Sequence, residues 1–186
     1  MKKFHSNIKL PVPFVPFEEQ YGPNQYIEKI PNLTLLNKEF FDWITDLKLK
    51  IIGARFFNSK PFQVYPIHID SGKSLKNCTK INLIFNSCDN VMNWYETIDP
   101  EYTGHVTTND LGVKVMHYKK ELCKVAHSAP VNSHCIMDGS IPHDLVNSAN
   151  NGQSRKCYTL YLGDPTTKEL ISWEQTVEIF RPYLID

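Results

Sequence analysis

The stretch FQVYPIHID, residues 62–70, is the most informative part of this sequence for its fold. Valine, isoleucine and aromatic residues dominate it, which is typical of a β-strand. The stretch ends in His68-Ile69-Asp70. Residues two apart in a strand point to the same face, so the side chains of His68 and Asp70 can converge on one metal ion. A single His-x-Asp match also arises by chance, so its meaning depends on the rest of the chain.

Similar short runs recur between residues 60 and 163. They are rich in Val, Ile, Tyr and Phe, and clusters of turn residues separate them. Several short strands without helices between them predict a sandwich or barrel and disfavour a βαβ fold. The later runs are KINLIFN, GVKVMHY, SHCIMD, HDLVN and KCYTLYL, and the turn clusters are SGKSLKN, NSCDN and NSANNGQS.

The chain before this β region has two parts. Residues 1–33 are rich in proline and show little periodicity, which predicts an irregular N-terminal arm. The next segment has apolar residues at helical spacing, with Asn37 as the expected N-cap. The apolar positions of this predicted helix are Leu36, Phe40, Trp43, Leu47 and Ile51.

A second helix is predicted over residues 172–185. It starts with Ser172 and Gln175, which stand three residues apart as in a capping box. A length of 186 residues suits one domain with a sizeable core. We therefore expect a single domain over residues 1–186, with a β core at 60–163 and helices that cover one face of a sheet.

The composition limits the classes of partner. Lys+Arg and Asp+Glu both number 20, so a general attraction to nucleic acid or to an anionic membrane is not indicated. The sequence has no apolar run long enough for a transmembrane helix and no apolar signal segment. The 5 cysteines form no Cys-x-x-Cys pair, which predicts free thiols. We expect a cytoplasmic protein without a membrane partner, and the sequence leaves its oligomeric state open.

Two further residues give His68 and Asp70 a context. His143 starts the run HDLVN, and strands that are distant in sequence can be neighbours in a β fold. Arg155 follows across Asn151-Gly152, a dipeptide typical of hairpins, so we expect it beside His143. The run KCYTLYL after Arg155 is typical of a buried strand, and a buried arginine needs an anionic partner such as a bound dicarboxylate.

HID, then PHDLVN, then an arginine twelve residues after His143 resembles the Fe(II)/2-oxoglutarate-dependent dioxygenase superfamily, and most of all its prolyl-hydroxylase-like branch. The resemblance covers about residues 65–163. It implies a mainly β fold with flanking helices, the double-stranded β-helix or jelly roll of cupin-like proteins. It also implies iron held by His68, Asp70 and His143, and 2-oxoglutarate held at its distal carboxylate by Arg155.

The same resemblance implies further positions around the co-substrate. Asn82 would face 2-oxoglutarate, and Tyr65 would donate a hydrogen bond to one of its carboxylates. Cys157 stands where many members have a serine, and a thiol is a weaker donor than a hydroxyl. Trp94 and Tyr95 have two open interpretations, as a substrate pocket or as core packing.

The predicted activity is the hydroxylation of a C–H bond with Fe(II), 2-oxoglutarate and O2, releasing succinate and CO2. Asp70 favours hydroxylation over halogenation, because halogenases of the family carry a small residue there. The substrate class stays open between an amino acid, a peptide and a small molecule.

Two alternatives compete with this activity. A cupin-like metal-binding module or sensor would use the same fold without turnover, but it needs no dicarboxylate anchor at Arg155. A zinc hydrolase would need a general base beside the metal ligands, and none is evident. His127 and His134 are possible rival ligands, and the remaining histidines, His5, His105 and His117, are expected to face solvent or to be structural.

Overall fold

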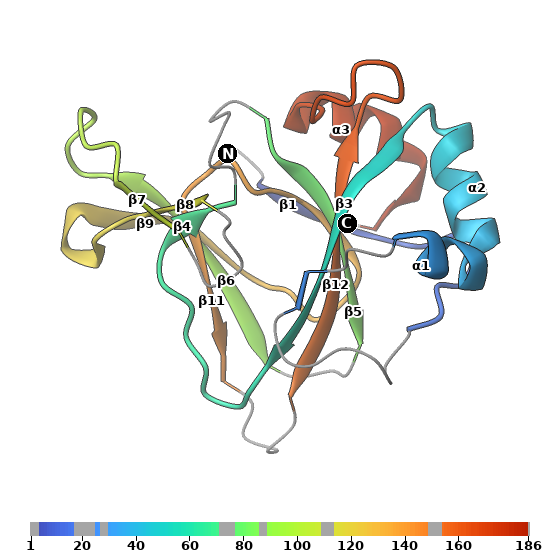
Figure 1. Ribbon diagram of the computed structural model, residues 1–186. Coiled ribbons are helices and arrows are strands. Elements are labelled where there is room, and N and C mark those ends of the chain that lie inside the picture. Colours follow the sequence, from blue (N-terminus) through green and yellow to red (C-terminus); the bar gives the residue numbers. More distant parts are fainter. Residues whose placement is uncertain are drawn as a thin grey trace.

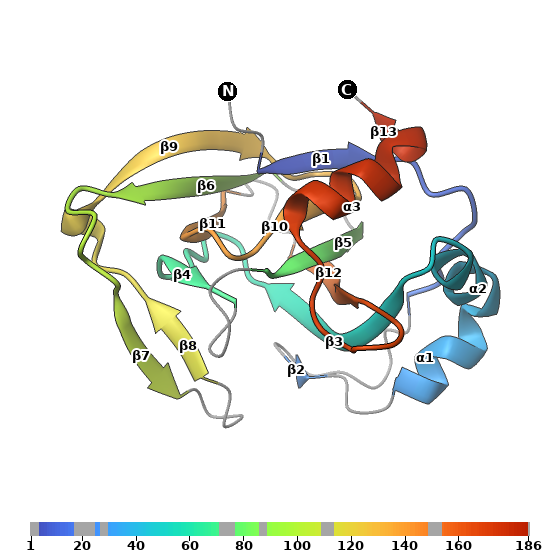
Figure 2. The same cartoon turned by 90° about the horizontal axis from the view of Figure 1, so that it is seen from above.

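The computed structural model describes residues 4–16, 25–26, 30–70, 77–85, 89–108, 114–148 and 154–185. Two antiparallel sheets face each other within these residues (Figures 1 and 2). The larger sheet contains, in spatial order, β13 (Leu184–Ile185), β1 (His5–Ile8), β10 (Cys135–Asp138), β5 (Thr79–Phe85), β12 (Arg155–Gly163), β3 (Lys50–Ser59) and β2 (Gln25–Tyr26). The smaller sheet contains β7 (His105–Thr108), β8 (Lys114–His117), β4 (His68–Ile69), β11 (His143–Asn147), β6 (Asn90–Thr97) and β9 (Cys123–Pro130).

The chain alternates between the sheets from β3 to β6 and again from β9 to β12, while the consecutive strands β6 to β9 all lie in the smaller sheet. In chain order β3, β5, β10 and β12 join the larger sheet, while β4, β6, β9 and β11 join the smaller one. This alternation is the double-stranded β-helix, or jelly roll. The predicted fold class, mainly β with flanking helices, is confirmed.

The predicted hairpin between β11 and β12 is wrong. β11 pairs with β4 and β6, whereas β12 pairs with β3 and β5 in the other sheet. The connection is therefore a crossover, and Asn151-Gly152 lies outside the described residues. As a result, Arg155 faces His143 across the gap between the sheets and does not lie beside it.

Most of the predicted strand runs are strands, and the run 62–69 is the partial exception. Only its end, His68–Ile69, belongs to a strand, while Val64 makes a single bridge to Val146. Pro66 lacks a backbone N–H, which explains why the ladder does not continue through it. The strands β3, β6, β7 and β9 were not predicted as strands.

In the part of the chain that the structure describes, three α-helices lie on the outer face of the larger sheet (Figure 1). Along β12, Tyr158 and Leu160 face these helices, whereas Arg155 and Thr159 face the smaller sheet. Apolar burial therefore alternates with polar lining along one strand. The helices are α1 (Ile30–Leu36), α2 (Lys38–Asp46) and α3 (Trp173–Phe180), and the short 3₁₀ turns are η1 (Lys120–Leu122) and η2 (Arg181–Tyr183).

The predicted first helix ends earlier than its apolar pattern suggests. Lys48 adopts a positive φ of 60°, and Ile51 then lies in β3. Asn37 stands at the N-cap of α2, but its side chain does not cap the helix. Its Oδ1 accepts a hydrogen bond from the Val15 N–H at 2.6 Å, and its Nδ2 donates to the Leu33 carbonyl, so it fastens the N-terminal segment to the helices.

The two chain ends also depart from the predictions. His5–Ile8 forms β1 between β10 and β13, so the irregular arm predicted over residues 1–33 is wrong for this segment. The predicted capping box of Ser172 and Gln175 is present, but the helix ends at Phe180. Pro182 follows, and proline cannot continue a helix without losing a hydrogen bond.

Two further sequence predictions concern transmembrane helices and free thiols in the described part of the chain. It contains no helix that is both long enough and apolar enough to cross a membrane. Its cysteines, Cys78, Cys123, Cys135 and Cys157, are free thiols, and Cys88 lies outside the described residues.

Candidate metal centre

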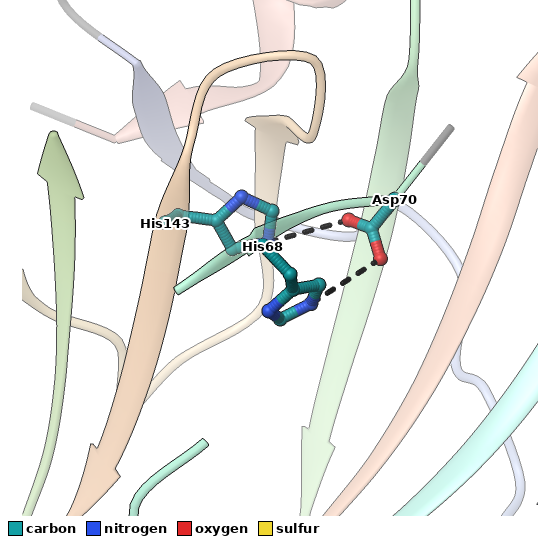
Figure 3. A group of neighbouring side chains, drawn as sticks. All are labelled: His68, Asp70 and His143. Carbon is teal, nitrogen blue, oxygen red and sulfur yellow. Dashed lines mark ion pairs between the residues drawn. The ribbon is translucent and has the colours of Figure 1, made fainter. Parts of the chain in front are cut away.

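His68, Asp70 and His143 converge between the two sheets (Figure 3). Their possible ligand atoms all lie within 4.8 Å of one another. His68 and His143 are direct cross-strand partners on β4 and β11, with ring centroids 4.7 Å apart. Asp70, just after β4, places Oδ1 3.8 Å from Nε2 of His68 and Oδ2 3.3 Å from Nε2 of His143. Two imidazoles and a carboxylate thus face one point.

Backbone carbonyls orient both imidazoles. Nδ1 of His68 lies 2.8 Å from the Pro66 carbonyl oxygen, and Nδ1 of His143 lies 2.8 Å from the Ile141 carbonyl oxygen. A carbonyl oxygen only accepts, so each Nδ1 carries the proton and donates. In the neutral rings the lone pair is then on Nε2, which faces Asp70 and is available to a metal ion.

The protonation states suit a metal ion. Burial, and then the neighbouring His143, lower the pKa of His68 to about 4, so its ring is neutral at pH 7. Burial acts to raise the pKa of Asp70, but the Lys80 ammonium and then His143 outweigh it and hold that pKa well below its usual range. Metal ions bind neutral imidazole and ionised carboxylate, so no proton has to leave at neutral pH from either of these two residues.

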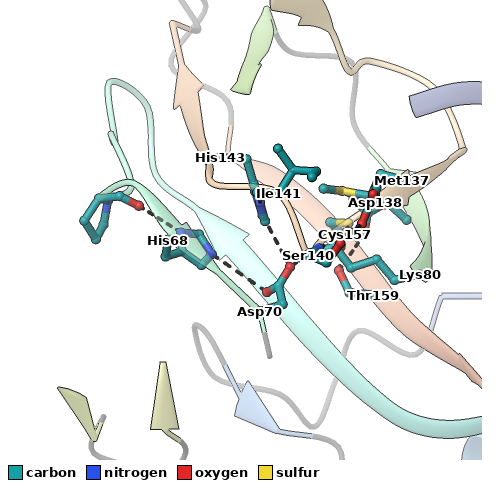
Figure 4. A network of polar contacts seen from close by, with 12 residues as sticks. His68, Asp70, Lys80, Met137, Asp138, Ser140, Ile141, His143, Cys157 and Thr159 are labelled. Atoms are coloured by element: carbon teal, nitrogen blue, oxygen red, sulfur yellow. Dashed lines mark hydrogen bonds and ion pairs between the residues drawn. The ribbon is translucent and has the colours of Figure 1, made fainter. Parts of the chain in front are cut away.

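Lys80 is a component of the site that the sequence analysis missed. Its buried ammonium forms an ion pair with Oδ2 of Asp70 (Figure 4). Lys80 and Asn82 are two residues apart on β5, so both face the cavity. The signal was present in the run KINLIFN, because a lysine at the inward position of a buried strand needs an anionic partner.

Gly139 is required by the close packing around the carboxylate. A Cβ built at this position would lie 2.6 Å from Oδ2 of Asp70 and 3.1 Å from the Cys78 carbonyl oxygen. The Gly139 carbonyl also accepts a hydrogen bond from the Asp70 N–H at 3.0 Å. A glycine here therefore allows the backbone to approach Asp70 and hold it.

A cavity of about 50 Å³ lies beside these ligands, between the two sheets. This is several times the roughly 10–15 Å³ that one water molecule needs on the same measure. It brings together six residues that the sequence analysis named: Tyr65, His68, Asp70, Asn82, His143 and Arg155. The other lining residues are Phe57, Ser59, Lys80, Met92, Leu145 and Thr159.

Arg155 is the most unusual polar group of this cavity. It is 3% exposed, and its Nε and Nη2 have no hydrogen-bond partner among the described residues. Burying a guanidinium without acceptors is costly, and such groups are normally paired. The arrangement therefore calls for an anion with at least two acceptor atoms.

The predicted co-substrate residues have different surroundings. Tyr65 Oη lies 3.0 Å from Ser59 Oγ, and Asn82 Oδ1 accepts a hydrogen bond from Thr159 Oγ1 at 2.7 Å. Cys157 belongs to the apolar core beside the cavity and is not among the lining residues. The hydroxyl that accompanies Arg155 along the inward face of β12 is therefore that of Thr159, four residues on.

Trp94 and Tyr95 do not line this cavity. Trp94 is fully buried and stacks on His5, with ring centroids 5.2 Å apart, which supports the core-packing interpretation. Tyr95 donates a hydrogen bond to Oδ2 of Asp144 at 2.7 Å. His134 accepts the Ile84 N–H at 3.0 Å through Nδ1, and His127 lies beside Trp94. Neither His127 nor His134 joins the metal-ligand group found among the described residues.

Comparisons with known proteins leave the chemistry open. No protein-family model matches the chain, and no curated protein matches it. Among solved structures, EvdO2 from Micromonospora carbonacea var. aurantiaca is 13% identical with a TM-score of 0.47, and the match covers 74% of this chain. The chain spans 65% of the length of EvdO2.

Two more solved structures are similar to a comparable degree. AviO1 from Streptomyces viridochromogenes Tue57 is 11% identical, with a TM-score of 0.47 over 92% of this chain and 78% of its own. A prolyl-4-hydroxylase from Pseudomonas putida is 15% identical, with a TM-score of 0.37 over 75% of this chain and 70% of its own. These values are too low to carry a conclusion about activity.

Proposed function

We propose that this protein is an Fe(II)- and 2-oxoglutarate-dependent oxygenase that hydroxylates a C–H bond of an amino-acid, peptidyl or small-molecule substrate. One observation carries the proposal. A His-Asp-His ligand group and a buried arginine with unpartnered N–H groups line the same small cavity. The ligand group needs a cation, and the buried arginine needs an anion.

The ligand group fits ferrous iron. His68, Asp70 and His143 would hold the ion through two imidazole nitrogens and one carboxylate, the donor set of non-haem Fe(II) oxygenases. With 2-oxoglutarate and O2, the iron supplies oxidative decarboxylation to succinate and CO2, coupled to hydroxylation of the substrate. The carbonyls of Pro66 and Ile141 fix the two rings so that Nε2 stays directed at the ion.

The side of the cavity that carries Arg155 fits a dicarboxylate. Arg155 offers two adjacent N–H donors, the fork that binds a carboxylate at two points. The hydroxyl of Tyr65 and the side chain of Thr159 line the same space and can orient the bound anion. Phe57, Met92 and Leu145 form apolar walls that keep water from the anion.

The main alternative is a metal-binding module of the same fold without turnover. Such a module would use His68, Asp70 and His143 but would have no use for Arg155. A buried guanidinium whose Nε and Nη2 lack a partner among the described residues is costly, so its presence favours the enzyme. The reducing cytoplasm is the compartment we propose, consistent with the free thiols of the described residues.

The test is an anaerobic titration of metal-free protein with Fe(II) and then 2-oxoglutarate, followed by visible absorption. We expect a charge-transfer band in the wild type and none in His68→Ala. Arg155→Leu should bind Fe(II) normally but need at least about tenfold more 2-oxoglutarate, the loss of a charge-assisted pair. Arg181→Leu is the matched control, because Arg181 is an exposed arginine paired with Glu178.

The outcomes separate the two functions. A folded wild type that binds Fe(II) but forms no band with 2-oxoglutarate would favour the metal-binding module. A band that needs the same 2-oxoglutarate concentration in Arg155→Leu as in Arg181→Leu would remove Arg155 from the site. Succinate release in air, measured with candidate amino acids and peptides, then identifies the substrate class.

A further inference from the structure

One row of rings crosses the whole smaller sheet. The sheet has the order β7-β8-β4-β11-β6-β9, and each strand carries one ring whose residue is directly paired with a ring-bearing residue of the next strand. Side chains of directly paired residues in an antiparallel sheet point to the same face, so these rings form a continuous line. In spatial order they are His127, Trp94, His143, His68, His117 and His105.

The metal centre occupies only the middle of this row. His143 and His68 belong to the centre, whereas His117 and His105 continue the row outward on β8 and β7. The ring centroids of His68 and His117 are 6.3 Å apart, and those of His117 and His105 are 5.9 Å apart. His117 is half-buried and His105 is exposed, so the outer pair is open to solvent.

We propose that His105 and His117 form a second binding site, for a divalent transition-metal ion that prefers imidazole, such as Zn²⁺, Ni²⁺ or Cu²⁺. The site lies next to the candidate centre but is separate from it. It does not depend on the proposed oxygenase activity.

The spacing of the pair suits one shared ion. A metal ion lies about 2.0–2.1 Å from an imidazole nitrogen, so two rings that share an ion have centroids up to roughly 6 Å apart. The 5.9 Å between His105 and His117 is within this limit before any side-chain rotation. Two adjacent strands hold the pair, since Val106 and Met116 continue the same register.

The donor atoms of His105 and His117 determine how tightly this second site binds an ion relative to the candidate metal centre. The described residues contain no second group of three ligands, so water would complete the coordination of an ion at His105 and His117. Two imidazoles without a carboxylate bind more weakly than the centre and favour the late first-row metals over Fe(II). The ion at the outer pair would therefore be the second to bind in a titration.

The experiment is a calorimetric titration of metal-free full-length protein with Zn²⁺ at pH 7.5. We expect the wild type to bind one ion more than His105→Asn, with the lost ion being the weaker one. His117→Asn should lose the same ion. Lys114→Gln is the matched control, because Lys114 is exposed on β8 of the same two-stranded ribbon and should keep every ion.

His68→Ala separates this site from the centre. It should lose the tight ion and keep the weak one, and Cu²⁺ electron paramagnetic resonance of this variant should carry coupling to two imidazole nitrogens. Two outcomes overturn the proposal. One is the same number of ions, with the same affinities, in the wild type and His105→Asn. The other is a weak ion whose spectrum is unchanged in both His105→Asn and His117→Asn.

Discussion

The two sheets contribute opposite chemistry to one cavity. The smaller sheet presents the imidazoles of His68 and His143, followed by the carboxylate of Asp70, and these groups attract a cation. The larger sheet presents the cation of Lys80, which pairs with Asp70, and the cation of Arg155, which attracts an anion. The difference indicates that neither sheet forms the site alone, and it supports the proposed occupant, a metal ion together with an anion.

The sheets also differ in how firmly they hold these groups. Arg155 starts β12, which pairs with β3 and β5 along most of its length in the middle of the larger sheet. His68 lies on β4, a strand of 2 residues that meets β11 through one residue pair. We infer that the anion side is formed before any ligand binds, whereas the metal side depends on its ion for rigidity.

Lys80→Met tests how the sheets depend on each other and has the largest expected effect. It leaves Asp70 buried without its cation, so the metal-free protein should lose about 3–5 kcal/mol of unfolding free energy. A divalent ion then replaces the missing charge, so Zn²⁺ should stabilise this variant more than it stabilises the wild type.

Chemical denaturation with and without Zn²⁺ measures both effects of Lys80→Met. Lys124→Met is the control, because Lys124 forms an exposed ion pair with Glu96 and should contribute less than about 1 kcal/mol. Equal stability of Lys80→Met and Lys124→Met without metal would show that Lys80 does not support Asp70.

His143→Ala removes a ligand from the smaller sheet only. We expect metal affinity to fall by more than about 100-fold, a larger loss than for residues that merely support ligands. Calorimetry measures the affinity, and circular dichroism checks the fold. His134→Ala is the control histidine, and an equal loss of affinity in both variants would contradict the assignment of His143.

The depressed pKa of His68 predicts a pH dependence. The folded protein takes up this proton only near pH 4, whereas the unfolded chain takes it up near 6.5, so the unfolded state binds more protons between these values. Without metal, stability should therefore fall with pH from about 6.5 towards 4, by roughly 1–2 kcal/mol between pH 7 and 5.

His68→Asn isolates that contribution. The unfolding free energy of the wild type, relative to this variant, should decline as the pH falls through the window and should stay level above pH 7. A difference between the two proteins that is constant from pH 7 to 5 would mean that His68 is not held neutral by the fold.

Thr159→Val, in the larger sheet, has the smallest expected effect. It removes the hydrogen bond from Thr159 to Asn82 and should cost about 1 kcal/mol of stability. Metal affinity should not change, because Thr159 faces the ligands from the other sheet. Denaturation and Zn²⁺ calorimetry together check this. A tenfold loss of metal affinity would show that the larger sheet also helps to hold the metal ion.

Local patterns predicted the smaller sheet's share of the site better than the larger sheet's. His68 and Asp70 are two residues apart at a strand end, and this period alone aligns them. Arg155 was predicted from its buried flank and its place after His143, but the predicted hairpin between them was wrong. A crossover and a hairpin have similar sequence patterns, because both join two strands through turn residues.

Other parts of the site depend on tertiary contacts that a single sequence does not reveal. A lysine in the buried run KINLIFN signals that an anionic partner is needed, but only the folded structure identifies that partner as Asp70. Cys157 was expected beside the co-substrate, yet Thr159 lines the cavity from the same inward face. The row from His127 to His105 draws on six strands that are scattered along the chain, so no local spacing signals it.

The shortness of β4 has a consequence for how well the protein resists proteolysis in a cell. Among the described strands, β4 alone stands between β8 and β11, and a bound ion would cross-link β4 to β11. Loss of the ion would leave the ribbon of β7 and β8 paired with the rest of the smaller sheet through β4 alone among the described strands. With iron as the proposed ion, iron supply would then govern how long the chain survives proteases, in addition to the proposed activity.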